Sequence, residues 1–297
     1  MRPAPRENLI ATLGALLLFA APQLLADNPY RDLLVDSDWL AERIEDPATV
    51  VLEVRFDPKN YDAFGHLPGA VQVKRLEDLA DPAQQPVVRA PLRERFQETL
   101  RGWGVNDDST LVLYDDTRTV LASRLFLLLD HFGFEQSRIK VLNGGTTEWT
   151  TFNELTREPV AIQPGNITLD ETRGIGVLID RDALAQLLAA PDSAVVLIDS
   201  RPVVEYREGH LPGAINISSI DGTDAETWTW MEEPEIAAMY DALPRDKPIV
   251  VYCNDGFRST LGYQQLKFLG YDDVRVYDGG WPDWKQAGLA TAAGDQP

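Results

Sequence analysis

One pattern occurs twice in this chain, and this repetition limits the possible folds more than any other feature. The matched pairs, first half against second, are "VVLEVR" (50–55) and "VVLIDSR" (195–201), "FGHLPGAVQV" (64–73) and "EGHLPGAINI" (208–217), "STLVLYDD" (109–116) and "KPIVVYCND" (247–255), and "IKVLNGGTTEW" (139–149) and "VRVYDGGWPDW" (274–284). The order is the same in both halves, which indicates an internal duplication and therefore two domains of one fold.

The strands of each copy are short and apolar throughout, and helical stretches separate them. Such strands are typical of a parallel sheet that is buried on both faces. Helices are expected at 38–46, 123–133, 181–190 and 259–270. The predicted fold class is α/β, with two tandem domains that are each a parallel sheet with helices on both faces.

The domain limits follow from composition. Residues 153–174 are polar, contain Pro159, Pro164 and Gly165, and lack apolar periodicity, as expected for a linker. We expect an N-terminal domain at 28–155, a linker at 156–171 and a C-terminal domain at 172–297.

The first 26 residues resemble a secretory signal peptide. Arg2 and Arg6 precede the apolar run "LIATLGALLLFAA", and the small residue Ala26 marks a cleavage site. This run is too short to span a bilayer, so we expect no membrane anchor once the signal is removed. The predicted location is periplasmic or secreted.

The net charge of the chain is −20. A field of that sign repels nucleic acid and anionic lipid, so neither is an expected partner. A site for an anionic substrate must therefore create its own local positive potential.

Cys253 is the single cysteine of the 297 residues and cannot form an internal disulfide. It follows the apolar strand "IVVY", at the sheet edge where ligand sites of open α/β sheets lie. Gly256 lets the next residues curl into an anion-binding nest, and the following helix adds its positive end. These surroundings, together with Arg258, predict a lowered pKa for the thiol. The alternative is a buried structural cysteine.

The segment "YCNDGFRS" resembles the Cys-x-x-Gly-x-Arg active-site loop of the rhodanese family of sulfurtransferases, and specifically of its tandem two-domain members. The two "GHLPGA" turns, "IDSR" and "YDGGWPDW" extend the resemblance over nearly the whole mature chain. The loop differs from the Cys-x-x-Gly-Val-Thr form of many two-domain thiosulfate and 3-mercaptopyruvate sulfurtransferases. In this family the C-terminal domain usually carries the persulfide, and here Asp115 takes the place of the cysteine in the first half.

The resemblance implies a two-step transfer. Cys253 and Arg258 are the expected catalytic residues, and a small anionic sulfur donor such as thiosulfate leaves a persulfide that a thiol or cyanide accepts. No metal or organic cofactor is expected. The expected substrate-binding residues are Arg201, Asn254, Asp255, Gly256, Phe257 and Ser259. For Arg201 an ion pair with Glu205 or Asp199 is the alternative, and Arg55 occupies its place in the first half.

Two other functions stay open. An exported persulfide carrier would deliver sulfur to one partner protein. A cysteine phosphatase would need five residues between the cysteine and the arginine, whereas four separate Cys253 from Arg258. The shorter loop favours a single sulfur atom over a phosphate group.

His66 and His210 sit in the repeated turn of both halves, so we expect them to stabilise the turn, and the dispersed histidines offer no metal-site spacing. Trp228 and Trp230 precede the catalytic strand and either pack in the core or line the pocket mouth.

Overall fold

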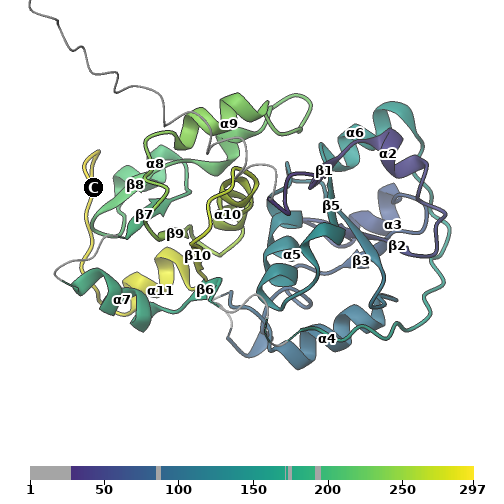
Figure 1. The fold of residues 1–297 in the computed structure, drawn as a ribbon, viewed down its shortest axis with the longest axis horizontal. Helices are drawn as coiled ribbons and strands as arrows, with labels where there is room; N and C mark the ends of the chain where they lie inside the picture. Colours follow the sequence, from purple (N-terminus) through teal and green to yellow (C-terminus); the bar gives the residue numbers. More distant parts are fainter. Residues whose placement is uncertain (1–27, 85–87, 171, 173–175, 191–194) are drawn as a thin grey trace, which may run out of the picture.

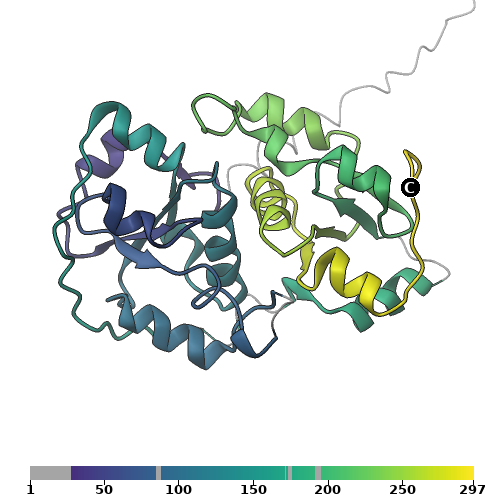
Figure 2. The same cartoon turned by 180° about the vertical axis from the view of Figure 1, so that it is seen from behind.

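The structure, a computed structural model, describes residues 28–84, 88–170, 172, 176–190 and 195–297. The predicted signal peptide lies outside the described residues. Figure 1 shows two bodies of similar architecture, and Figure 2 shows the same arrangement from behind.

The first body contains β1 (Leu34–Val35), α2 (Ser37–Ala41), β2 (Thr49–Val54), α3 (Asn60–Phe64), β3 (Val71–Val73), η1 (Pro82–Gln84), α4 (Arg93–Gly102), β4 (Thr110–Asp115), α5 (Val120–His131), η2 (Gln136–Arg138), β5 (Ile139–Leu142) and α6 (Gly145–Phe152). The second contains β6 (Leu178–Ile179), α7 (Arg181–Ala189), β7 (Val196–Asp199), α8 (Val203–Glu208), β8 (Ala214–Asn216), η3 (Ser219–Gly222), α9 (Glu233–Tyr240), β9 (Ile249–Tyr252), α10 (Arg258–Phe268), β10 (Val274–Tyr277) and α11 (Gly280–Gln286). The helix predicted at 38–46 was too long, because α2 ends at Ala41 and turns follow it.

Within the described ranges, each body contains one five-stranded sheet, and the strand orders are equivalent: β1-β5-β4-β2-β3 and β6-β10-β9-β7-β8. Every strand pair is parallel. The predicted α/β class with two parallel-sheet domains is therefore confirmed. Parallel strands place their carboxyl ends at one edge of the sheet, and the loops that follow β4 and β9 begin there.

Alternate residues of the central strands pack on opposite faces. Ile249 and Val251 of β9 belong to one apolar cluster, whereas Val250 and Tyr252 belong to another. Burial on both faces explains why this strand is a continuous apolar run in the sequence.

The two bodies share a core. Helices α5 and α10 pack against each other, and one apolar cluster includes Leu125 of α5 together with Leu261 of α10. At the same contact, the Ser123 and Thr260 hydroxyl oxygens lie 2.9 Å apart. Both central helices begin directly after the loops at the sheet edges, so this packing also sets the relative position of the two loops.

Residues 157–170 form neither helix nor strand. This part of the predicted linker lies against the first body, because Gly165 N donates to Arg101 O at 2.8 Å and Ile167 N donates to Val105 O at 3.1 Å. Ile167 and Leu169 are buried there. The domain limits themselves stay a prediction.

Candidate active site

The candidate catalytic loop, residues 253–258 and called the catalytic loop below, connects β9 to α10 at the carboxyl edge of the second sheet. Cys253 directly follows the strand, and Arg258 is the first residue of the helix. The cysteine side chain is fully buried. The edge position expected from the sequence is therefore the one observed.

Two glycines allow the backbone around Cys253 to pack closely. Gly256 has a φ of +74°, a left-handed conformation that favours glycine. A Cβ on Gly280 would lie 2.6 Å from the Cys253 carbonyl oxygen, and Trp281 N donates to that same oxygen at 2.8 Å. The repeated Gly-Gly turn thus supports the catalytic loop from the next strand.

The loop residues predicted from the sequence surround the sulfur to different degrees. Cys253 Sγ lies 3.4 Å from Ser259 Oγ and 3.9 Å from Asp255 Oδ1. Phe257 is buried and precedes the helix, whereas Asp255 is exposed. Ser259 therefore lies closer to the sulfur than Asp255 does, and it is in the first turn of α10, at the positive end of that helix.

The prediction of a lowered thiol pKa is wrong for the free enzyme. Burial raises the pKa of Cys253, because the thiolate loses its hydration, and the Asp255 carboxylate raises it further. The Ser259 N–H and hydroxyl groups and the Arg258 charge act in the opposite direction without reversing it. The thiol is thus mainly protonated near neutral pH, and any reaction in which this sulfur acts as a nucleophile must draw on a minor thiolate fraction.

Asp255→Asn is expected to accelerate sulfur uptake from thiosulfate at about pH 7 by roughly 3- to 10-fold. Loss of the carboxylate lowers the pKa of Cys253, so the thiolate fraction rises at neutral pH. Single-turnover rates measured from about pH 6 to about pH 10 test this expectation. The advantage of the variant should shrink as the pH rises and the wild-type thiol ionises, and a constant ratio across the range would contradict the expectation.

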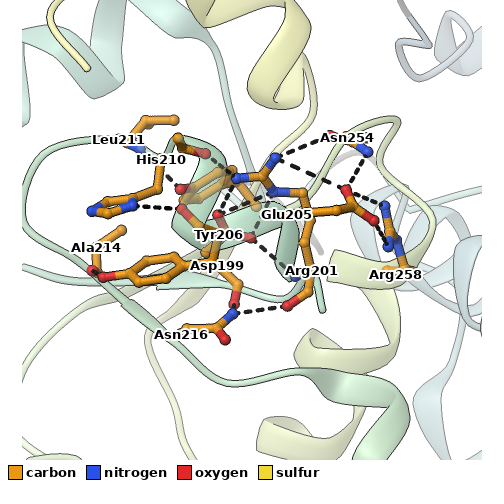
Figure 3. A network of polar contacts seen from close by, with 12 residues as sticks. Asp199, Arg201, Glu205, Tyr206, His210, Leu211, Ala214, Asn216, Asn254 and Arg258 are labelled. Carbon is orange, nitrogen blue, oxygen red and sulfur yellow. Dashed lines mark hydrogen bonds and ion pairs between the residues drawn. The ribbon is translucent and has the colours of Figure 1, made fainter. Parts of the chain in front are cut away.

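Arg258 forms an ion pair with Glu205. Its Nη1 and Nη2 atoms donate to Glu205 Oε1 and Oε2 at 2.7 and 3.2 Å. Glu205 Oε2 also accepts from Asn254 Nδ2 at 2.7 Å. Figure 3 shows this carboxylate between the two loop residues. The sequence suggested Glu205 only as a partner of Arg201.

Arg201 has the ion pair that was left as the alternative to donor binding. Its Nε and Nη2 donate to the Asp199 carboxylate at 3.0 and 2.7 Å, and Nη2 also donates to Gly209 O at 2.6 Å. The side chain is 2% exposed. Arg55 repeats the arrangement with Glu53 and Gly65 O in the half without a cysteine. This arginine position therefore stabilises the turn in both domains.

The loop after β4 contains an anion of its own. The Asp115 carboxylate, fully surrounded by protein, accepts from a set of backbone N–H groups at 2.7–3.0 Å. The donors are Thr117, Thr119, Leu121 and Ala122, and the Thr117 hydroxyl adds a further bond at 2.9 Å. A loop of this position and topology can therefore hold a negative charge with backbone donors, and in the first half Asp115 already fills it.

A buried ion pair from both domains lies beside the catalytic loop. Arg124 of α5 donates from Nη1 to Asp278 Oδ1, and Asp278 Oδ2 accepts from Ala90 N at 2.5 Å. A Cβ on Gly256 would be 3.1 Å from Asp278 Oδ1 and 3.2 Å from Arg124 Nη1. Arg124 was not predicted from the sequence as a residue of this site, although one charge within the apolar stretch "SRLFLLL" was a usable signal.

A cavity of about 600 Å³ adjoins the loop. Its lining includes Arg201, Glu205, Glu208 and Asn254, and also Trp281 and Lys285 of α11. Lys285 Nζ lies 5.1 Å from the centre of the Trp281 ring. The cavity thus presents charges of both signs around one aromatic side chain.

His66, His210 and Trp230 each pack against another aromatic ring. His66 stacks on Tyr61 and His210 on Tyr206, with ring centres 4.1 and 3.8 Å apart, as expected for a turn built the same way in each half. Trp230 is buried and meets Phe268 edge to face. Trp228 is partly buried at a φ of +66°.

In the described part of the chain, no three His, Cys, Asp or Glu side chains gather as a set of metal ligands. A search of the same residues found no helix with the length and apolarity needed to cross a membrane.

Comparison with protein families gives two matches within the chain, at residues 36–151 and 180–287, both to the rhodanese-like domain. Among curated proteins, the sulfur carrier protein TtuD of Thermus thermophilus is 31% identical over 287 residues, covering 89% of this chain and 98% of TtuD. A thiosulfate sulfurtransferase of Corynebacterium glutamicum is 30% identical over 275 residues, covering 84% of this chain and 87% of that protein.

A solved structure is similar over the same extent. This structure is SseA from Escherichia coli, which is described as a 3-mercaptopyruvate sulfotransferase with the rhodanese fold. It matches with a TM-score of 0.73 at 26% identity. The match covers 84% of this chain and 98% of SseA.

Proposed function

This chain belongs to the rhodanese-like family and is a sulfurtransferase, and we propose that it moves sulfane sulfur through a persulfide on Cys253. The donor is a small sulfur compound such as thiosulfate or 3-mercaptopyruvate, and the acceptor is cyanide or a thiol. The expected substrate-binding residues stay Arg201, Asn254, Asp255, Gly256, Phe257 and Ser259.

One observation supports this site above others: the single cysteine lies in a strand-to-helix loop whose counterpart in the first half holds a carboxylate with backbone N–H groups. In the second half a cysteine replaces that aspartate. A persulfide anion on Cys253 would then take the place that the Asp115 carboxylate takes in its own loop.

The transfer has two balanced steps. The Cys253 thiolate attacks the outer sulfur of thiosulfate, the S–S bond of the donor breaks, and its electron pair leaves with sulfite. The acceptor then attacks the terminal sulfur of the persulfide, and the Cys253 thiolate is released. The proton of the thiol passes to solvent before the first step, because only the thiolate is nucleophilic.

A second candidate function is a sulfur carrier that passes its persulfide to one partner protein. It is favoured by the likeness to the carrier TtuD and by the buried thiol, whose raised pKa suits slow loading rather than rapid turnover. The candidates differ in the range of acceptors that they serve.

Steady-state transfer to cyanide, measured with thiosulfate and with 3-mercaptopyruvate, tests the enzyme. Intact mass spectrometry should detect an adduct of about 32 Da, one sulfur atom, after the donor alone is added. An adduct that no small acceptor removes would favour the carrier. If neither donor produced an adduct or turnover, the proposed function would be wrong.

We also propose that the protein is exported to the periplasm or secreted. The support is the sequence of residues 1–26, with its arginines, apolar run and small residue at Ala26. Expression of the full chain followed by mass determination of the periplasmic and external protein should reveal a mature N-terminus near Asp27.

A further inference from the structure

Glu205 joins the two ends of the catalytic loop through one carboxylate. Its oxygens accept from both Nη atoms of Arg258, at 2.7 and 3.2 Å, and from Asn254 Nδ2 at 2.7 Å. Arg201 Nη1 is 3.9 Å away. Figure 3 shows the ion pair between Glu205 and Arg258. Their side chains are 30% and 22% exposed, so the pair can be reached from solvent.

This arrangement neutralises the positive charge that the loop offers. Arg258 is paired with Glu205, and Arg201 is paired with Asp199. Hydrogen bonds from Arg258 and Asn254 lower the pKa of Glu205, so its carboxylate is ionised at neutral pH. A donor that arrives with two negative charges must therefore displace this carboxylate from Arg258 or approach it against electrostatic repulsion.

We propose that Glu205 determines donor specificity by occupying the face of Arg258 that an anionic donor would use. The inference rests on the proposed function and names the substrate class. Sulfane donors without a second negative charge, such as persulfides of small aminothiols, are preferred over thiosulfate. Rejection by a built-in like charge is a common way to obtain specificity.

The chemistry at Cys253 is the same for both donor classes. The thiolate attacks the outer sulfur, and the donor S–S bond breaks with its electron pair on the leaving group. That group is sulfite from thiosulfate and an alkyl thiolate from a persulfide. The donors therefore differ in the net charge that they bring close to Glu205. Thiosulfate carries two negative charges, whereas cysteamine persulfide has no net charge because its ammonium group balances the persulfide anion.

The test compares Glu205→Gln with Glu208→Gln. Glutamine keeps the size of the side chain and an oxygen acceptor for Asn254 and Arg258. Glu208 lies in the same helix and lines the same cavity, so its substitution removes an equal charge. Each variant is assayed for kcat/KM with thiosulfate and with cysteamine persulfide, using cyanide as acceptor.

Glu205→Gln is expected to raise kcat/KM for thiosulfate by about 10- to 100-fold, with a change of less than about 3-fold for cysteamine persulfide. Glu208→Gln should change both by less than about 3-fold. Equal changes with both donors, no change with thiosulfate, or the same gain in Glu208→Gln would each overturn the proposal.

A direct measurement of anion binding covers the case in which the variant turns over poorly. Sulfate, a dianion that cannot transfer sulfur, should compete with cysteamine persulfide at least about 10-fold more strongly in Glu205→Gln than in the wild type. Unchanged competition would also overturn the assignment. Wild-type sulfur loading on Cys253 tests the proposed function separately, so failure of the two ideas can be distinguished.

Discussion

Replacing Cys253 with serine is expected to lower sulfur transfer by at least about 10³-fold with every donor, because serine cannot carry the transferred sulfur as a persulfide. The fold should persist, since the two side chains are similar in size and Ser259 Oγ can pair with the new hydroxyl. Steady-state assays with thiosulfate and 3-mercaptopyruvate measure the loss.

The chain itself provides a strong control for this experiment. Cys253 is the single cysteine, so a sulfur adduct on a thiol can form at one position only. Cys253→Ser should show no adduct by intact mass, while its thermal unfolding midpoint stays close to that of the wild type. Full residual activity in a folded variant would contradict the persulfide mechanism.

The largest expected loss of stability follows from Asp115→Ala, at about 3–5 kcal/mol of unfolding free energy. Four backbone N–H groups that now bond one carboxylate would lose this acceptor within a buried loop, and Leu121 N would keep its second bond, to Thr117 Oγ1 at 3.2 Å. Burial also raises the pKa of Asp115, so its carboxylate relies on these donors for compensation.

Urea unfolding of Asp115→Ala and Asp116→Ala provides the comparison. Asp116 is the adjacent carboxylate and accepts one backbone bond, from Phe56 N at 2.9 Å. Its removal should cost about 1 kcal/mol or less. If both variants lost the same free energy, the backbone donors around Asp115 would not constitute an anion-binding loop, and the main support for the persulfide site would weaken.

The sequence was most informative about architecture. Strand after strand could be located because both faces of a parallel sheet are buried, so β2, β4, β7 and β9 are nearly continuous apolar runs. Duplication then reinforced each assignment with a second copy. The helix predicted at 38–46 was too long because apolar residues at helical spacing continue past Ala41, where α2 ends. Residues in turns, such as Ile44, can also pack their side chains against the core.

The position of the reactive residue was also predictable. A cysteine directly after a parallel strand, followed by glycine and a helix, lies at the sheet edge for reasons of chain geometry alone. Its ionisation was not predictable in the same way. The lowered pKa expected from the helix end and Arg258 neglected burial and Asp255, which together determine the direction of the shift.

The ion pairs within the site join residues that are distant in sequence, so the sequence did not predict them. Arg258 pairs with Glu205 of another helix, and Arg124 of the first domain reaches Asp278 of the second. Local patterns contain no information on such distances, because many carboxylates could satisfy each arginine. The buried charge of Arg124 in the apolar part of helix α5 indicated that a partner must exist, but not which one.

The sequence by itself determined the duplication, the α/β class and the strand end that holds the thiol, since these follow from local periodicity, glycine positions and chain direction. The tertiary structure alone decided which charges meet at the catalytic loop, how deeply the sulfur is buried and which backbone N–H groups bind the Asp115 carboxylate in the other loop. Electrostatic energies depend on distance and on exposure to water, and both are defined only once the two sheets and their central helices are packed.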